Sequence, residues 1–427
     1  MSEKLQYAGQ YTLVAADVIQ SGGLAIDVRD QIQLINIYED LFSPFMSGSL
    51  AMVDTNDLPS LFANSGTDLL RLVIKTPTIP DKDVISRYFH IYKLSDRIAI
   101  NERSQTYMLH FISVEALVNS SFNIGKTFKG KAEENISSIL KENLKTDVKF
   151  NASSTVNDVY YTSNLWSSVD NIAFNADYAL SANGTPSMLF FENREGFQFK
   201  SLVDIYNSKP VLSFAASNNL SQITEGGINN GDVFKDLQQD YSNISSVVTK
   251  EYYDYYKDKA NGLMSSRLFS YDLTTKKLKD ITYNSTTDKR ARANPNKFYT
   301  DAVVNTSYKG STSTILMPHL KHSKLYNGTV DVSDFKTKQK RIALLRNFQQ
   351  HKIEITVLGR TDYTVGMCIA VDINKMKEFN RGTDRTTITD PMVSGNYVIS
   401  AIYHRFDREG KHESTIECIR DAIGKVK

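Results

Sequence analysis

The chain has 427 residues, enough for roughly two to four domains that each bury a hydrophobic core. Hydrophobic residues make up 41% and charged residues 23%, as in ordinary globular proteins, and the 23 tyrosines and 21 phenylalanines favour β-structure. The net charge is only +2 and both signs are interspersed, which excludes a basic stripe that would grip nucleic-acid phosphates.

The N-terminal segment, Met1–Gln6, is polar and lacks the apolar core of a signal peptide. No later run is long enough to span a bilayer, so we expect no membrane insertion by this chain. The two cysteines, Cys368 and Cys418, fall in predicted strands. In a protein assembled in the cytosol we expect them to be buried thiols and not a disulfide.

Residues 1–118 predict β-structure. Alternating apolar residues predict strands at Tyr11–Val14, Leu24–Val28, Gln31–Tyr38 and Leu69–Ile74. Pro77 and Pro80 predict an exposed loop, and Asn101–Ser104 a hairpin turn. We expect a small closed or nearly closed sheet here, because closure removes unprotected strand edges.

Residues 119–215 predict a middle α+β domain. Apolar spacing indicates one helix over Glu134–Leu144 and a second that Ser163 or Asn164 caps, with its apolar stripe over Leu165–Ala176 and a stop at Asn183–Gly184. Met188–Phe199 predicts a hairpin with its turn at Asn193–Gly196.

Residues 216–340 predict an irregular, β-containing region, part of which joins a second β-unit and part a lower platform. Strands are possible over Tyr241–Tyr256 and Leu268–Leu273, and the polar stretch 284–313 predicts a loop or surface insertion. A helix is expected over Lys338–Phe348. Residues 341–427 predict the second β-unit, with its first strand near His351.

The two ends of the chain carry the same succession of strands. The N-terminal copy comprises Leu50–Leu58, Phe89–Arg97 and Leu109–Ser113, and the C-terminal copy comprises Ile355–Tyr363, Tyr397–Arg405 and Ile416–Arg420. Order and spacing agree, and Arg97 and Arg405 occupy the same place. This agreement indicates two related antiparallel β-units in one polypeptide.

Two short motifs suggest phosphate or metal binding only weakly. Gly125–Thr127 resembles the end of a phosphate-binding loop, but Ser120 stands where that motif needs glycine. His319 and His322 lie three residues apart without acidic or thiol ligands nearby, which favours an exposed polar loop over a metal site. We therefore predict no cofactor-binding and no metal-binding residues.

Two further patterns define alternative functions. Glu192 and Glu195 flank a turn and could be the paired acids of a peptidoglycan hydrolase, although acids in a hairpin turn are usually solvated. The tyrosines of Glu251–Tyr256, Tyr253 and Tyr255 in particular, could stack on sugars, which would make the chain a carbohydrate-binding tail or surface protein, although core and interface packing is the better interpretation. No nucleophile elbow is present, and we predict no catalytic residues and no enzymatic activity.

The layout resembles the central baseplate hub proteins of contractile-tailed bacteriophages, which are related to the hub part of VgrG spikes. Four segments carry the resemblance: Gly23–Asp27 with Ile32–Tyr38, Tyr107–Glu115 leading into Ile124–Gly130, the Phe190–Phe199 hairpin, and Gly395–His404 followed by Ile416–Asp421. The resemblance implies an α+β, mainly β fold, with two related tube-type antiparallel β-barrels and intervening α+β domains.

The resemblance also implies a structural role and a set of partners. Three chains would form a homotrimeric ring of six barrels that adapts the hexameric tail tube above to the trimeric central spike below. Baseplate wedge or other hub proteins would bind outside, with tape measure protein or DNA in the lumen. The location implied is the virion tail baseplate, after assembly in the host cytoplasm. Because the chain stops after the second unit, we expect the piercing tip and any hydrolase to be separate chains.

Overall fold

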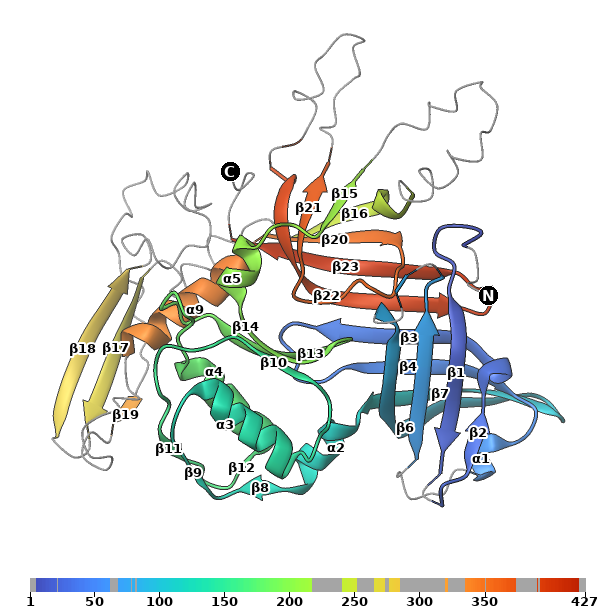
Figure 1. Cartoon of the computed structure of the whole chain (residues 1–427), viewed down its shortest axis with the longest axis horizontal. Helices are drawn as coiled ribbons and strands as arrows, with labels where there is room; N and C mark the ends of the chain where they lie inside the picture. The colour runs from blue at the N-terminus through green and yellow to red at the C-terminus, as the bar shows by residue number, and fades with distance from the viewer. Residues whose placement is uncertain are drawn as a thin grey trace, which may run out of the picture.

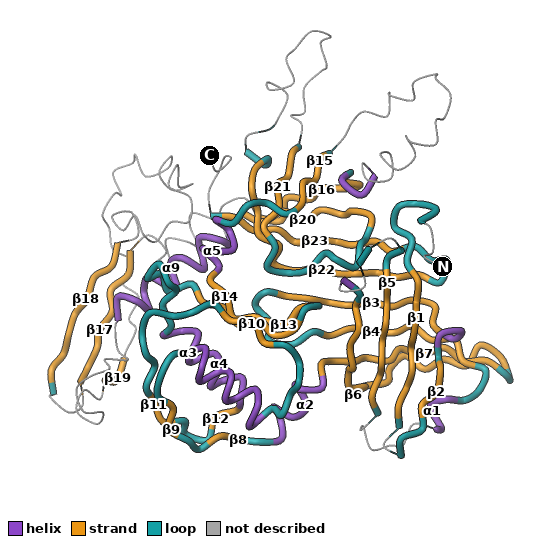
Figure 2. Tube along the Cα trace, viewed as in Figure 1, coloured by secondary structure: helices purple, strands orange, loops and turns teal. Residues whose placement is uncertain are grey.

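The fold is a mainly β arrangement with helices gathered in its middle region, as a computed structural model of the chain shows (Figures 1 and 2). The structure describes residues 5–20, 22–61, 68–77, 79–80, 83–216, 240–251, 265–272, 276–284, 319–321, 335–349, 351–373, 390 and 392–421. The predicted α+β, mainly β class is confirmed.

The first β-unit contains seven strands and two short helical segments. They are β1 (Thr12–Ile19), β2 (Ala25–Asp27), η1 (Arg29–Gln31), β3 (Ile32–Asp40), β4 (Ser47–Asp54), α1 (Leu58–Leu61), β5 (Leu69–Lys75), β6 (Ile85–Asn101) and β7 (Ser104–Ser113). Burial alternates along β7 and most of β5, as expected of strands with one face on a core. The strands predicted here from alternation, and the turn between β6 and β7, are confirmed.

The second β-unit is assembled from more distant parts of the chain. Its strands are β15 (Leu212–Ala215), β16 (Ile244–Glu251), β20 (His351–Leu358), β21 (Cys368–Asp372), β22 (Gly395–Asp407) and β23 (His412–Arg420). The sheet order β16-β20-β23-β22-β21 repeats the order β3-β4-β7-β6-β5 of the first unit. The predicted duplication is therefore confirmed in the topology.

The two units also share their register and their irregularities. Leu50 lies opposite Leu109 in the first unit, and Ile355 lies opposite Ile416 in the second, which is the alignment that the sequence predicts. The register shifts after Ile91 on β6 and at the equivalent place after Ile399 on β22. A bulge is one extra residue at a defined position, so a shared one is a specific mark of common architecture.

The prediction of closed barrels is wrong for the part of the chain that the structure describes. One sheet runs through both units, because β22 pairs with β21 over its first residues and with β3 over Ala401–Asp407. The edge of β3 is thereby joined to the second unit and does not close the first (Figure 1). In the second unit a single bridge between Ala215 and Asn243 joins β15 to the residue preceding β16. Each unit curls without a continuous ladder between its ends.

The middle region packs helices against short strands. Its elements are α2 (Val114–Ser121), β8 (Asn123–Ile124), β9 (Thr127–Phe128), α3 (Ala132–Ser138), the π-helical turn η3 (Ile139–Asn143), β10 (Phe150–Ala152), β11 (Tyr161–Thr162), β12 (Trp166–Ser167), α4 (Ser168–Tyr178), β13 (Met188–Asn193), β14 (Gly196–Ser201) and α5 (Leu202–Asn207). The helix predicted at Glu134–Leu144 and the β13–β14 hairpin are confirmed.

The predicted ends of α4 are wrong by several residues. Ser167, and not Ser163 or Asn164, caps the helix, and its hydroxyl accepts a hydrogen bond from the Asp170 N–H at 3.1 Å. Trp166 is instead in β12, where it pairs with Ile124. The helix ends at Tyr178, before the predicted stop, because the chain is extended from Ala179.

The remaining elements belong to the least regular part of the sequence. They are β17 (Ser265–Asp272), β18 (Lys277–Asn284), β19 (His319–Lys321) and α9 (Phe335–Gln349). Strands predicted near Val248 and Leu268 are confirmed as β16 and β17, and so is the predicted helix at Lys338–Phe348. Most of the polar segment 284–313 and the tyrosines at 252–256 lie outside the described residues.

Three large buried clusters stabilise the described part of the chain: one in the first β-unit, one in the middle region, and one that joins the second β-unit to β13, α5 and α9. Two side chains cross between the clusters of the units. Phe406 of β22 packs in the cluster of the first unit, and Leu41, just after β3, packs in that of the second. The β3–β22 junction is therefore held by exchanged apolar side chains as well as by backbone hydrogen bonds. The four-part domain division stays a prediction.

Candidate functional site: the junction of the two β-units

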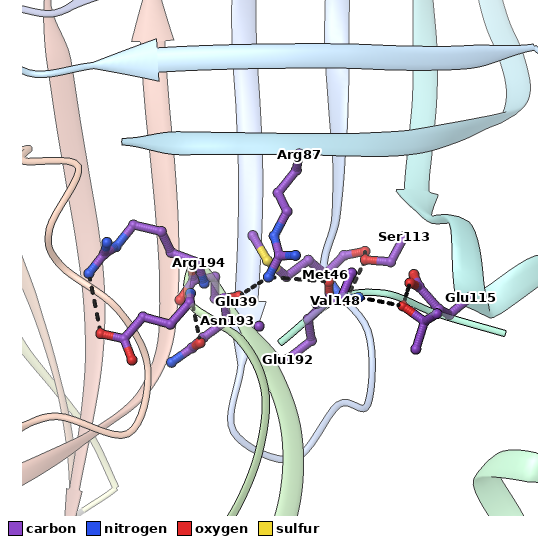
Figure 3. Close-up of polar contacts among 12 residues, drawn as sticks. Glu39, Met46, Arg87, Ser113, Glu115, Val148, Glu192, Asn193 and Arg194 are labelled. Carbon is purple, nitrogen blue, oxygen red and sulfur yellow. Dashed lines mark hydrogen bonds and ion pairs between the residues drawn. The ribbon is translucent and has the colours of Figure 1, made fainter. Parts of the chain in front are cut away.

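The turn of the β13–β14 hairpin reaches the place where the two β-units meet. Figure 3 shows its residues Glu192, Asn193 and Arg194 among side chains of the first unit. Gly196, at φ +125°, allows this tight turn, and a Cβ there would lie 2.2 Å from the Lys149 carbonyl oxygen. The hairpin thus brings the middle region into contact with both β-units.

Glu39, on β3, connects three parts of the chain through one buried carboxylate. It accepts hydrogen bonds from the Thr364 hydroxyl at 2.7 Å, the Val365 N–H at 3.0 Å and the Arg194 N–H at 3.1 Å. Thr364 and Val365 belong to the loop between β20 and β21 of the second unit. Burial raises the pKa of Glu39, and these donors oppose that rise.

Glu192, on β13, makes the corresponding connection to the first unit. Its carboxylate is 3% exposed and accepts hydrogen bonds from the Met46 N–H at 3.0 Å and from the Ser113 hydroxyl. The Arg87 guanidinium lies 4.0 Å from its other oxygen. Burial raises the pKa of Glu192 to about 7, although Arg87, Ser113 and Met46 each act to lower it.

Two arginines complete the polar cluster. Arg87 of β6 donates to the Asn193 carbonyl at 2.9 Å, and Arg194 pairs with Asp83 at 3.1 Å, also in the first unit. The Asn193 amide lies 3.4 Å from the Val365 carbonyl oxygen. Because charged groups are costly to bury without partners, this network fixes how the hairpin and the two units fit together.

A pair of buried histidines lies further along β22 and β23. The ring nitrogens of His404 and His412 are 3.0 Å apart, and the Phe406 ring stacks on His412 with centroids 4.0 Å apart. Burial lowers the pKa of His404 to about 3, and that of His412 well below its ordinary value. Both rings are therefore neutral at physiological pH and serve as packing and hydrogen-bonding groups.

The structure revises the expectation for the paired acids. Glu195 is about half exposed, as predicted for a turn, but Glu192 is buried among protein donors and the prediction of a solvated side chain is wrong for it. Glu192 is buried because β13 has hydrophobic cores on both of its faces. The apolar run Met188–Phe191, just before this acid, is the sequence signal that indicates such a strand. In this arrangement Glu192 is held by the protein and is not presented to a glycan.

The other candidate motifs have ordinary structural roles. Lys126 pairs with Glu142 at 2.8 Å, and Thr127 lies in β9, where its hydroxyl is 3.0 Å from that of Thr162. His319 lies in β19, which pairs with β17, so the prediction of a loop there is wrong, and His322 lies outside the described residues. Cys368 and Cys418 are free and buried, as predicted.

Within the ranges that the structure describes, no three His, Cys, Asp or Glu side chains gather as metal ligands would. Over the same ranges, no helix combines the length and the apolar character that crossing a bilayer requires. Glu39, Arg87 and Arg194, which the sequence does not single out, are the charged groups that hold the junction together with Glu192.

Comparisons with known proteins give a match in structure only. No family model matches the chain, and no curated protein matches its sequence. A tail protein from Neisseria meningitidis MC58 aligns over 96% of this chain and 97% of its own, with 11% identity and a TM-score of 0.55. The 43 kDa tail protein of prophage MuSo2 from Shewanella oneidensis aligns over 96% and 99%, with 10% identity and a TM-score of 0.52.

These alignments extend over nearly the whole of each chain, so the likeness includes both β-units and the middle region. The chain therefore has the fold of these tail proteins. The resemblance to phage tail hubs and the mainly β fold that it implies are confirmed, except that the β-units are not closed into barrels in the described residues.

Proposed function

We propose that the chain is a structural hub of a contractile phage tail baseplate. Three copies form a ring with six β-units, which adapts a hexameric tail tube to a trimeric central spike and frames the channel through which DNA leaves. The protein resides in the virion tail and is assembled in the host cytoplasm.

The observation that carries this proposal is the duplication inside one chain. Two units with the same strand order and the same register are joined edge to edge by β3 and β22. A six-fold ring cannot pair equivalently with a three-fold one, because each lower subunit faces two upper subunits in different registers. A trimer of two-unit chains resolves this mismatch, since it offers six similar docking surfaces.

The buried polar cluster supports the same role. Glu39 and Glu192 fix the two units and the middle hairpin in one arrangement, as a rigid adapter requires. The middle region is the part of the chain that would face the spike, while the β-units face the tube. Wedge or other hub proteins would bind the outside of the ring, with tape measure protein or DNA in the lumen. The role requires no cofactor and no catalysis.

Native mass measurement over a range of concentrations tests the proposal. We expect a trimer with interfaces on the order of 2,000 Å² or more per pair of chains, as in permanent assemblies. A strict monomer at every concentration, with or without a purified tube protein, would contradict a hub role. A cell-wall hydrolysis assay with the Glu192→Gln and Glu195→Gln variants would reveal the alternative enzymatic function.

A further inference from the structure

Within the chain, the two units are joined by the pairing of β22 with β3. The strands that correspond to these two in the other unit have no such partner among the described residues. β22 pairs with β23 on one side, and the second half of its other side, Ala401–Asp407, pairs with β3. By topology β6 is the counterpart of β22, and β16 is the counterpart of β3. The same junction could therefore form a second time, between β6 and β16.

Both of these counterpart edges are unoccupied by any ladder among the described residues. β5 covers β6 only over Ile85–His90, which leaves one edge of the strand beyond Ile91 without a neighbouring strand. β16 pairs with β20 alone and ends the sheet. β6 belongs to the first unit and β16 to the second, and several strands separate them in the sheet order. Within one chain the two free edges are therefore not paired with each other.

The exposed half of β6 carries the charged residues Lys93, Asp96 and Arg97, but both edges also expose apolar side chains. Exposed edges are normally blunted by charge or proline, because free backbone groups invite another strand. Leu94, Ile98 and Ile100 of β6 are 38%, 63% and 57% exposed, and Val248 of β16 is 45% exposed. At the counterpart of Leu94 on β22, Ile402 pairs with β3 and is 1% exposed, packed in the core cluster of the second unit. Exposed apolar side chains on a free edge indicate a surface that becomes covered.

We propose that β6 of one chain pairs antiparallel with β16 of the next copy, as β22 pairs with β3 within the chain. This inference rests on the proposed function for the number of copies, but the pairing itself rests on the repeat. Repetition of one head-to-tail contact closes a ring when its rotation divides the full circle. In a trimer, three internal and three intermolecular junctions would then alternate around six β-units.

The internal junction also fixes the register of the proposed one. Arg405 lies opposite Glu413 on one side and Asn36 on the other. The counterpart of the Arg405–Glu413 pair is Ile98 opposite Thr106. The counterpart of Asn36, which lies opposite Ser49, is Val248, which lies opposite Glu354.

Ile98 of one chain should therefore lie directly opposite Val248 of its neighbour. Both side chains are β-branched and both are exposed in the single chain. Such apolar pairs stabilise adjacent strands, and directly opposite Cβ atoms lie about 4.5–5.5 Å apart.

Cysteine crosslinking of the full chain tests this pairing. The double variant Ile98→Cys with Val248→Cys, treated with a short bis-maleimide, should give covalent dimers and trimers on a denaturing gel. Either single variant should stay monomeric, and a mixture of the two should stop at the dimer. The pair Ile98→Cys with Val156→Cys is the matched control, because Val156 is 52% exposed, close to the 45% of Val248, but lies in the middle region. Cys368 and Cys418 are buried and should not react.

A second variant tests the same contact without crosslinking. Ile98→Asp places a charge where the neighbour would pack, so it should weaken the trimer at least tenfold while the secondary structure of the chain is unchanged. Val156→Asp should leave assembly as in the wild type.

The outcomes separate this inference from the proposed function. A native trimer that gives no Ile98–Val248 crosslink, or that tolerates Ile98→Asp, would overturn the pairing and leave the hub proposal standing. Covalent products larger than three chains would overturn ring closure by this contact. Absence of any oligomer, in the wild type as well, would count against both.

Discussion

The buried carboxylate of Glu192 should make the stability of this protein fall as the pH rises from about 4.5 to about 7. We compare the wild type with Glu192→Gln, which keeps the shape of the side chain and an oxygen that can accept from Met46 and Ser113. The variant removes the ionisation and replaces one carboxylate oxygen by an NH2 group. Its neutral amide resembles the protonated carboxyl that burial favours in the folded chain.

The expected magnitude follows from the pKa of Glu192, which burial raises from 4.5 to about 7. Between these two values the folded chain binds a proton that the unfolded chain has released, so stability decreases as pH increases. One pH unit corresponds to about 1.4 kcal/mol, which gives a loss of about 3 kcal/mol over the whole interval. From roughly pH 5 to pH 8 we expect about 2–3 kcal/mol of this loss.

Urea unfolding at roughly pH 5 and pH 8, at one protein concentration, measures the effect. Other buried groups titrate in both proteins, so the quantity that matters is the difference between wild type and Glu192→Gln at each pH. The variant should gain about 2–3 kcal/mol on the wild type as the pH rises. Glu195→Gln is the matched control, because this neighbouring side chain is about half exposed and its loss should change stability by less than about 0.5 kcal/mol.

Equal pH dependence of the wild type and Glu192→Gln would refute this reasoning. A variant that is much less stable at pH 8 would also refute it, because that result would mean that the ionised carboxylate stabilises the junction.

Three other predictions concern the same junction and its supports. Glu39→Ala should lower the free energy of unfolding by about 3–5 kcal/mol in urea, because three buried donors lose their acceptor, whereas Thr364→Val should cost only about 1 kcal/mol. Gly48→Ala should cost about 1–3 kcal/mol, because its Cβ would lie 2.3 Å from the Asn36 carbonyl oxygen, and Gly22→Ala, with open space around it, is the control. Because the pKa of His404 falls from 6.5 to about 3 on burial, the stability that depends on its neutral form is present above pH 6.5 and lost as the pH falls towards 3. His404→Gln should therefore lose less of its neutral-pH stability than the wild type does as the pH falls. Acid titrations followed by fluorescence measure this difference.

The sequence predicts the duplicated strands well because their information is local. Alternation in segments such as Leu109–Ser113 and Ile416–Arg420 locates each strand and its buried face. Spacing then aligns the two copies, and the structure places Leu50 and Ile355 in equivalent positions. The alignment of Arg97 with Arg405 shifts by one residue in the structure, because β6 has a further bulge at this point.

The closure of the units could not be predicted in the same way. The free backbone groups of an edge strand can form hydrogen bonds with a strand of the same unit, of the other unit or of another copy of the chain. All three provide the same hydrogen bonds. That β3 pairs with β22 depends on the tertiary arrangement and leaves no periodic signal. Long-range polar contacts are hidden for the same reason. The partners of Glu39 are 155 to 326 residues away in the sequence, so its burial gives no local pattern.

Imaging of single purified particles tests the central claim most directly, since the claim is that two like units in one chain repeat around an axis. Class averages of the assembled wild-type protein should show a ring with three-fold symmetry and six lobes at nearly equal spacing around a channel. Particles with only two lobes at assembly concentrations, or rings whose lobe number is not six, would contradict it.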